Sequence, residues 1–581
     1  MMKKNDLINN VFFIICLIMS VLPLSACNKY NQSYDKAPVD KLMTPTDKQD
    51  LYVTPMTEPV LYLTVGFNSK SNYTSYYSWK DIHSHDLSWY ETNEINIPYC
   101  EALVQFGNDE GPVPTGFGYG YFSPNATVRL IGQKASKRPQ KSYKVKINSG
   151  RGNISGIKNF NLNKSFGDPF RFLNKLSYDL MTEIDPLLST RSSFVHLYVK
   201  DKSLGDDQLF VDYGLYTMTE SINKRYLSNR ELDSTGELYE IENFDFRRHE
   251  DVIMQPTDSR FNQKEFEKLL EAEGSNDYSK LIKMLDDLND DSKDIENIVK
   301  TYFDEDNLYS FMAFNILMDN KDTDTENFYL YSPMGFDKFY IIPVDMDGSL
   351  REKYEILRNS DYSAGWKKGI YLYTDSLLFS KILRNQNCVS KLNGYINNLH
   401  ETVLSPNNVS EKASQLAKEV KPYLYSLPDI RFARVTEEDY DKLVSEISAQ
   451  MEENYYSHYD SILTPWPFHI NEPTVKDGNI VLNWEDSFIL NGQVSYDVIL
   501  SDTWSFKKVL MDKKNLTQTT LDIGSLVPGQ YFLKVVAKSD NGYDLQQEAY
   551  EYYNTETKKT IHGVMCFYVK DDGTVTKLTY K

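Results

Sequence analysis

The chain has 581 residues, of which 41% are hydrophobic and 25% are charged, and its formal net charge at pH 7 is -20. A chain of this length can bury large hydrophobic cores and is expected to form more than one domain. The acidic excess argues against a nucleic-acid partner, because binding to a phosphate backbone requires basic surface.

The N-terminus has the pattern of an export signal. Two lysines precede the apolar run 11–19, and a Leu-Ser-Ala-Cys sequence follows that ends at Cys27. This sequence resembles a bacterial lipobox, which implies lipidation of Cys27. The alternative, an uncleaved membrane anchor, is disfavoured because the apolar run is short for a spanning helix. We therefore expect residues 1–27 to be a lipoprotein signal peptide, and the rest of the chain to lie outside the cytoplasm, anchored to the bacterial cell membrane by its lipid.

Two kinds of pattern follow in the next 400 residues. Residues 28–56 are polar and show little periodicity, so they are expected to form a flexible linker. Short β-like runs dominate from 61 to about 147. Later stretches have apolar residues at helical spacing, which predicts helices at 169–184, 263–272, 278–288, 292–302, 308–318, 377–384, 389–404, 409–423 and 437–455. The fold class indicated is α+β, with a β-rich lobe, a helical lobe and a cleft between them in residues 57–465.

The last part of the chain, residues 466–581, contains short strand patterns only. Trp484 on an early strand, a Leu-Val-Pro-Gly turn and Tyr531 at the start of the strand after it resemble a fibronectin type III sandwich. We expect a separate all-β binding or spacer module, in which no catalytic constellation is visible.

The strongest functional signal is an acidic loop between a helical pattern and two strand-like runs. Asp322 precedes Asn327 by five residues, and the strand-like run 339–344 is followed by Asp345 and Asp347. An acid, an amide and a further acid at a strand end is the order in which a protein-kinase active site arranges its base and its metal ligands. Because 83 of the 581 residues are acidic, an Asp five residues before an Asn is expected several times by chance, and the spacing alone is weak evidence. The helical pattern before the loop and the strand-like runs after it make the assignment stronger.

Each residue type in this loop suits a step of phosphoryl transfer. Carboxylate and amide oxygens are the ligands that Mg²⁺ prefers, so Asn327 with Asp345 or Asp347 would hold Mg²⁺ or Mn²⁺. Asp322 would accept or orient the proton of the substrate hydroxyl.

Basic residues concentrate in one segment of this acidic chain. A bound phosphate is a better explanation for them than a long polyanion, although lysines on a solvated strand face are the alternative. The segment contains Lys134, Lys137, Arg138, Lys141, Lys144 and Lys146.

Taken together, the motifs of residues 60–460 resemble the CotH family, the spore-coat-type protein kinases with an atypical kinase fold. Residues 132–143 look like the family's Gly-rich loop, which ends in Pro-Lys-Lys-Ser-Tyr. Asn174-Lys175-Leu176 and the strand 213–220, with its Gly-Leu-Tyr and Glu220, resemble further family motifs. The acidic loop and the Pro-Val-Asp-Met-Asp sequence at 343–347 complete the set.

The resemblance implies a two-lobed, atypical protein-kinase-like fold that uses ATP as co-substrate. It places Lys141 at the ATP phosphates, with Ser136 and Glu220 also at the ATP site. Asp322 becomes the catalytic acid–base residue, and the metal ligands are Asn327, Asp345 and Asp347. Three roles are open for Glu220: it pairs with the lysine, faces the nucleotide, or ends a strand near the hinge.

The expected function is that of an exported, lipid-anchored kinase, which transfers the γ-phosphate of ATP to Ser, Thr or Tyr of a surface or coat protein. Some positions depart from the family pattern. Gln140 replaces the first Lys of the loop motif, Ile131 and Leu173 replace arginines, and Val344 replaces a Trp. Two alternatives therefore stay open: a catalytically inactive scaffold or adhesion protein, and transfer of AMP instead of phosphate.

Overall fold

The computed structural model describes residues 47–52, 59–67, 77–205, 207–320, 323–358 and 369–580. The predicted signal peptide with Cys27, most of the predicted linker, and Asp322 lie outside these residues. Among the helices of the described part, none combines the length and the apolar character needed to cross a membrane.

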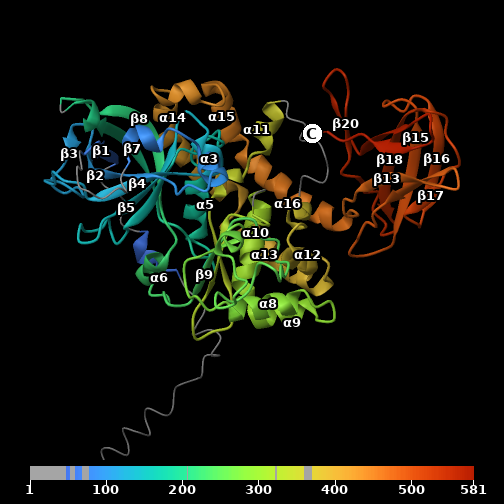
Figure 1. Cartoon of the computed structure of the whole chain (residues 1–581), viewed down its shortest axis with the longest axis horizontal. Helices are drawn as coiled ribbons and strands as arrows, with labels where there is room; N and C mark the ends of the chain where they lie inside the picture. The colour runs from blue at the N-terminus through green and yellow to red at the C-terminus, as the bar shows by residue number, and fades with distance from the viewer. Residues whose placement is uncertain are drawn as a thin grey trace, which may run out of the picture. The chain divides into compact units, whose positions relative to one another are not determined.

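A closed β-barrel occupies the first part of the described chain (Figure 1, blue to green). Its strands follow the order β1-β7-β8-β6-β5-β4-β2, and β2 pairs back with β1, while the short β3 extends from β2. β1 and β7 are parallel and the other pairs are antiparallel. The strands are β1 (Val60–Val65), β2 (Tyr99–Asn108), β3 (Gly111–Pro112), β4 (Ala126–Ile131), β5 (Ser142–Ile147), β6 (Asn159–Asn163), β7 (Ser192–Asp201) and β8 (Val211–Glu220).

Alternating side chains explain the barrel. In β4, Ala126, Val128 and Leu130 are buried while the residues between them are half-buried, and Val145 on β5 is buried opposite Val128. A period of two is the pattern of strands with one apolar face. The short helices α2 (Trp79–Ile82), α3 (Leu87–Thr92) and α4 (Gln133–Ser136) lie in its loops.

A second sheet has the order β10-β9-β11-β12 and carries the predicted acidic loop at one end. One face packs on α10 (Glu305–Leu317), a helix whose residues from Asn307 to Leu317 are all buried. The other face packs on Tyr226 of α6 (Lys224–Asn229). The strands are β9 (Glu237–Ile241), β10 (Leu270–Ala272), β11 (Phe328–Ser332) and β12 (Tyr340–Pro343).

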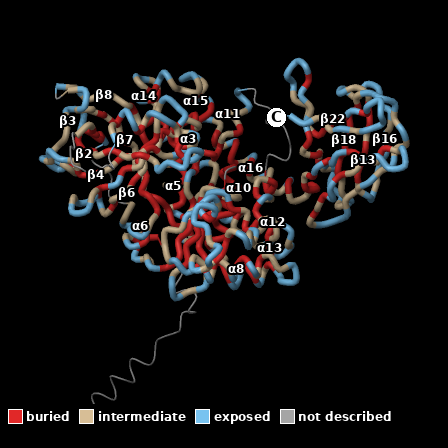
Figure 2. The backbone as a smooth tube through the Cα atoms, in the orientation of Figure 1, coloured by how far each residue is buried: buried red, intermediate tan, exposed pale blue. Residues whose placement is uncertain are grey.

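Helices make up most of the rest of the region before residue 464, as the spacing of apolar residues predicts. They are α5 (Leu173–Met181), α7 (Gln263–Phe266), α8 (Ser279–Leu288), α9 (Ile295–Tyr302), α11 (Glu352–Leu357), α12 (Leu377–Leu383), α13 (Gln386–Glu401), α14 (Pro406–Leu424), α15 (Glu437–Ser445) and α16 (Ile447–Leu463). Figure 2 shows buried residues concentrated inside the barrel and around α10. The helix predicted over 263–272 is wrong in its second half, because Leu270–Ala272 pairs with β9.

The region after Pro467 is β-rich, and with the barrel and helices it confirms the α+β class. Trp484 belongs to a hydrophobic cluster formed by side chains of both larger sheets there. The fibronectin-type assignment stays a prediction. The strands are β13 (Ile470–Lys476), β14 (Asn479–Trp484), β15 (Val494–Ser501), β16 (Val509–Leu516), β17 (Thr520–Asp522), β18 (Gly529–Ser539), β19 (Gln546–Glu548), β20 (Tyr552–Asn554), β21 (Thr560–His562), β22 (Val564–Val569) and β23 (Val575–Lys577).

Candidate functional site

Asn327 and Asp345 lie together at the open end of the β11–β12 hairpin. The backbone N–H of Val344 donates a hydrogen bond to the carbonyl oxygen of Asn327, 3.0 Å away. Both residues have left-handed backbone, with φ of 67° at Asn327 and 50° at Asp345. This conformation is uncommon outside glycine, although Asn and Asp adopt it more readily than other residues. The hairpin thus brings together two of the three predicted metal ligands.

Helix α5 fixes the backbone on the far side of Asp345. The N–H of Asp345 donates to the hydroxyl oxygen of Tyr178 at 3.0 Å, and the N–H of Met346 donates to Oδ1 of Asn174 at 2.5 Å. The Nδ2 of Asn174 also lies 3.4 Å from Oδ1 of Asp345. Asn174 and Tyr178 are four residues apart and therefore share one helix face. Asn174 belongs to a motif that the family resemblance singles out, although without this contact, and nothing in the pattern singles out Tyr178.

The two predicted carboxylate ligands lie near the same phenol. Burial raises the pKa of Tyr178, and the charges of Asp345 and Asp347 raise it further. Asp345 is exposed, whereas Asp347 and Asn327 are half-buried. Two carboxylates and an amide in one partly open place form a donor set that fits a hard divalent cation such as Mg²⁺. These three residues could therefore hold the predicted metal.

Asp324 is an acidic residue of the same loop that the sequence argument does not select. It is half-buried, and burial first, then the nearby charge of Asp375, raises its pKa to about 7. A carboxyl group with this pKa can both bind and release a proton near neutral pH. The predicted base Asp322 is two residues away in the chain and outside the described residues.

The predicted Gly-rich segment forms a turn and the short helix α4 between β4 and β5. Gly132 has φ of 76°, which a residue with a side chain would adopt only under strain. Ser136 is buried; its hydroxyl accepts from the N–H of Leu87 at 3.0 Å and donates to the carbonyl of Gln133 at 2.8 Å. The Nζ of Lys141 donates to the carbonyl oxygen of Ser136. Lys141 and Ser136 are thus neighbours, and the serine hydroxyl links α4 to α3; their role at an ATP site stays a prediction.

Burial changes the basicity of Lys141. It lowers the pKa of the ammonium group, and the charge of Asp86 opposes this effect. Two other lysines of the basic segment lie near acidic groups. Burial raises the pKa of Glu240 and of Glu273; the charge of Lys144 opposes this effect at both glutamates, and that of Lys146 opposes it at Glu273. Part of the basic segment therefore faces protein carboxylates.

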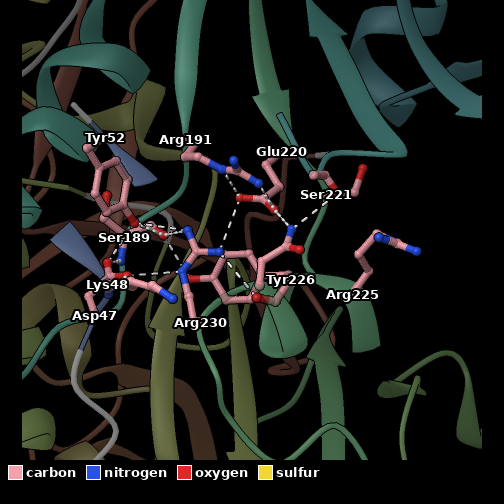
Figure 3. Close-up of polar contacts among 12 residues, drawn as sticks. Asp47, Lys48, Tyr52, Ser189, Arg191, Glu220, Ser221, Arg225, Tyr226 and Arg230 are labelled. Carbon is pink, nitrogen blue, oxygen red and sulfur yellow. Dashed lines mark hydrogen bonds and ion pairs between the residues drawn. The ribbon is translucent and has the colours of Figure 1, made fainter. Parts of the chain in front are cut away.

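Glu220, at the end of β8, lies in a buried ion network (Figure 3). Its Oε1 is 2.7 Å from Nη2 of Arg191, and its Oε2 is 3.2 Å from Nη1 of Arg230. Burial acts to raise the pKa of Glu220, but the hydrogen bond from Arg191 and the charge of Arg230 outweigh it, and the pKa is lowered. Both carboxylate oxygens therefore pair with arginines, which excludes the pair with Lys141 in this structure.

The same network reaches residues 47–52, within the predicted linker. Nε of Arg230 donates to Asp47 at 3.0 Å, and Nη2 donates to the hydroxyl of Tyr52 at 2.9 Å and to the carbonyl of Ser189 at 2.8 Å. The guanidinium also stacks on the ring of Tyr226, 3.6 Å from its centroid. Figure 3 shows these groups converging on Arg230. This end of the predicted linker is thus bound to the last strand of the barrel.

A second acidic group lies on the neighbouring strands. Carboxylate oxygens of Glu240, Glu242 and Glu271 lie within 4.8 Å of one another. Glu240 is opposite Tyr329 of β11, on the sheet that carries the predicted loop. Burial raises the pKa of Glu240, and the charge of Glu271 adds to the effect. No sequence motif joins these three residues: Glu240 lies in β9, Glu242 directly follows that strand, and Glu271 lies in β10.

Comparison with known proteins identifies a family whose model matches this chain. Residues 128–457 match the family model described as CotH kinase protein. No curated protein matches the chain. A chain in the solved structure described as "Shewanella oneidensis MR-1 Toxin Antitoxin System HipA, HipB and its operator DNA complex" is 9% identical, with 61% of this chain and 75% of that chain covered and a TM-score of 0.25. A TM-score this low carries no argument about the fold.

Proposed function

The chain belongs to the CotH kinase family, whose model matches more than half of it, and from this we propose that it transfers the γ-phosphate of ATP to a hydroxyl group of Ser, Thr or Tyr. The protein substrate is a surface or coat protein outside the cytoplasm. This location is proposed from the lipoprotein pattern that ends at Cys27.

The observation that supports the proposal most is the junction of Asn327 and Asp345. Two residues predicted as metal ligands meet at a hairpin end, both in left-handed backbone, and α5 holds one of them by a buried tyrosine and an asparagine. Backbone strain of this kind costs of order 1–3 kcal/mol per residue and concentrates at functional sites.

In the proposed reaction the substrate oxygen forms a bond to the γ-phosphorus while the bond from that phosphorus to the β–γ bridging oxygen breaks, and ADP leaves. Asp322 accepts the hydroxyl proton, and Lys141 contacts the phosphates. Asn327, Asp345 and Asp347 would hold a divalent ion, which would neutralise the charge that develops on the phosphoryl oxygens.

The alternative is a catalytically inactive scaffold or adhesion protein, and one observation favours it. Active protein kinases need an ion pair between the phosphate-binding lysine and a glutamate. Here Lys141 donates to the carbonyl of Ser136, and Glu220 pairs with Arg191 and Arg230. If Glu220 is the family glutamate, binding of ATP has to proceed without that pair.

Two measurements separate these functions. The first is the thermal stability of the full chain with and without ATP and Mg²⁺, for the wild type and for the Asp345→Asn/Asp347→Asn variant. A ligand at about 100 times its dissociation constant stabilises by about 2.7 kcal/mol. A metal-dependent shift that the variant loses supports the kinase site, and a well-folded wild type without any shift supports the scaffold.

The second measurement identifies the transferred group. The chain is incubated with an acceptor protein and ATP labelled at either the α- or the γ-phosphorus. Label from the γ position alone supports phosphoryl transfer, whereas label from the α position shows transfer of AMP and overturns the proposed reaction.

A further inference from the structure

Arginines from distant parts of the chain gather around the ring of Phe166. The guanidinium carbon lies 4.8 Å from the ring centroid for Arg138, 5.1 Å for Arg434 and 5.7 Å for Arg171. Phe166 is half-buried, Arg138 is exposed, and Arg171 is buried. Three guanidinium groups thus share one aromatic ring.

A second ring, that of Tyr354, extends the group. Nε of Arg434 donates to the hydroxyl oxygen of Tyr354 at 2.9 Å, and Nη1 of Arg358 donates to the same oxygen at 3.1 Å. Arg351 also lies near this group. Its Nη1 is 3.9 Å from the position that a Cβ atom would occupy on Gly167, the residue that follows Phe166. We call this set the arginine cluster; its members are Arg138, Arg171, Arg351, Arg358 and Arg434.

The positive charge of the cluster exceeds the negative charge paired with it. Within the described ranges, no carboxylate forms an ion pair with Arg138, Arg358 or Arg434, whereas Arg351 pairs with Glu355 at 2.9 Å. The Nε of Arg351 is buried and has no hydrogen-bond partner among the described residues. Guanidinium groups held this close repel one another, and a bound anion would offset that repulsion.

Unlike most arginines of the cluster, the neighbouring Lys164 has a carboxylate partner among the described residues. Lys164 pairs with Asp429 at 2.7 Å and donates to the carbonyl oxygens of Tyr213 and Leu215. The buried Arg171 lies next to this pair and donates to the carbonyl of Lys164. Burial lowers its pKa; the charges of Asp429 and Asp168 oppose this effect, and the charge of Arg434 adds to it. The repulsion inside the cluster therefore reaches a buried side chain.

The cluster is connected to both halves of the proposed phosphotransfer site. Arg138 belongs to the Gly-rich segment that carries Lys141, and Arg171 lies two residues before α5, the helix that holds Asp345. Arg351 follows Asp347 by four residues. A ligand bound to these guanidinium groups is therefore held by the same segments that carry the predicted ATP and metal ligands.

We propose that the arginine cluster binds a phosphorylated side chain of the protein substrate. Guanidinium groups match phosphate oxygens with paired N–H donors, and contact with the rings of Phe166 and Tyr354 limits the orientation of these groups, which suits one discrete anion. Clusters of arginines of this kind recognise phosphorylated motifs in peptides. Attraction to an anionic membrane surface needs basic charge but no such orientation. The ligand would come from an earlier phosphoryl transfer to Ser, Thr or Tyr.

Only the role of this ligand as a kinase substrate rests on the proposed function; its binding does not. The test therefore measures binding without ATP. The full chain is titrated into a labelled Gly-Ser peptide that carries one phosphoserine, and into the same peptide without phosphate. We expect the phosphopeptide to bind at least about tenfold more tightly, since charge-assisted, bidentate hydrogen bonds are about twice as strong as neutral ones.

Variants identify the site. Arg138→Gln/Arg434→Gln is expected to lose about tenfold in phosphopeptide affinity. Arg138→Lys/Arg434→Lys keeps the charge but not the planar guanidinium, so we expect a smaller loss of affinity. Arg431→Gln is the matched control, since this arginine is exposed, three residues from Arg434, and outside the cluster. Arg138→Gln alone, at an exposed position, covers the case in which the double variant fails to fold.

The proposal is overturned if the two peptides bind alike, or if folded Arg138→Gln/Arg434→Gln keeps the preference for phosphate. It is also overturned if inorganic phosphate displaces the phosphopeptide at equal concentration, because the site would then recognise free phosphate. The same holds if vesicles containing phosphatidylserine bind the wild type and lose binding in the double variant. Asp345→Asn is expected to keep phosphopeptide binding, so failure of the kinase reaction and failure of this site give different results.

Discussion

The backbone N–H of Asp345 donates a hydrogen bond to the phenolic oxygen of Tyr178, 3.0 Å away. Asp345 is exposed, whereas Tyr178 is buried in α5. The orientation of a surface carboxylate with a predicted metal-binding role thus depends on a side chain of the interior.

Removal of that hydroxyl is expected to weaken the proposed metal site more than the fold. In Tyr178→Phe the partly buried N–H of Asp345 loses its acceptor, which costs about 1–3 kcal/mol. We expect the variant to fold and to lose most of the thermal shift produced by ATP and Mg²⁺. Tyr302→Phe is the control, because its hydroxyl bonds to Asp287 and has no role in the site. A full nucleotide response in Tyr178→Phe would contradict the positioning role.

Two substitutions of Asn327 separate backbone strain from ligand loss. Glycine adopts the observed φ of 67° without strain, whereas alanine in left-handed backbone costs about 1–2 kcal/mol. We expect Asn327→Ala to be less stable than Asn327→Gly by that amount in urea unfolding. Both variants are expected to lose the metal-dependent response to ATP, and a response kept by Asn327→Gly would remove the amide from the ligand set.

Among the polar contacts at the end of the barrel, we expect the ion network around Arg230 to be the one whose loss reduces folding stability most. Arg230 is buried and pairs with Asp47 and Glu220. Removing one partner of a buried ion pair destabilises by about 3–5 kcal/mol, because the other charges stay buried without compensation. Arg230→Met should show this loss in urea unfolding. Lys48→Gln is the control: Lys48 and Glu231 form an exposed pair, for which a change of about 1 kcal/mol or less is expected. Equal effects of the two substitutions would show that the network contributes little.

The raised pKa of Asp324 predicts that the stability of the folded chain depends on pH. Its pKa is about 7 in the folded chain, against an ordinary value of 3.8. A carboxyl group whose pKa is raised by folding binds more protons in the folded state, so its contribution is present below about pH 4 and is lost as the pH rises through about 7.

The measurement is urea unfolding of the metal-free chain at several pH values across that range, for the wild type and Asp324→Asn. We expect the wild type to lose stability relative to the variant by at most about 1.4 kcal/mol per pH unit. Asp109→Asn, at an exposed turn residue, serves as the control and should follow the wild type. A constant difference between wild type and Asp324→Asn would contradict the raised pKa.

Local patterns predict the elements of this chain better than their pairing. The helical spacing predicts α8 and α10 within a few residues of their observed bounds, and the strands β4 and β5 lie in the stretch 61–147 where β-like runs dominate. The stretch 263–272 fails because Leu270–Ala272 finds a partner in β9, and a tertiary pairing of this kind overrides local preference. Closure of the barrel has no local signal at all.

Some residues of the candidate site can be identified from the sequence, and others only from the folded structure. Asn327 and Asp345 stand out because a strand-like run separates them at short range. Tyr178 and Arg434 contribute from segments more than 80 residues away in the chain, and their residue types have no unusual spacing, so only the folded chain identifies them.

The parallel pair of β1 and β7 determines when the barrel can form during synthesis. Val60 pairs with His196, so β1 has to wait for more than 130 further residues before its second neighbour exists. β8, which ends at Glu220, is needed as well, because it joins β7 to β6. Pairing across such long separations is slow, since the entropy of loop closure is lost before the contacts form. A nascent or truncated chain that ends before Glu220 therefore exposes the apolar faces of unclosed strands, a state that favours aggregation.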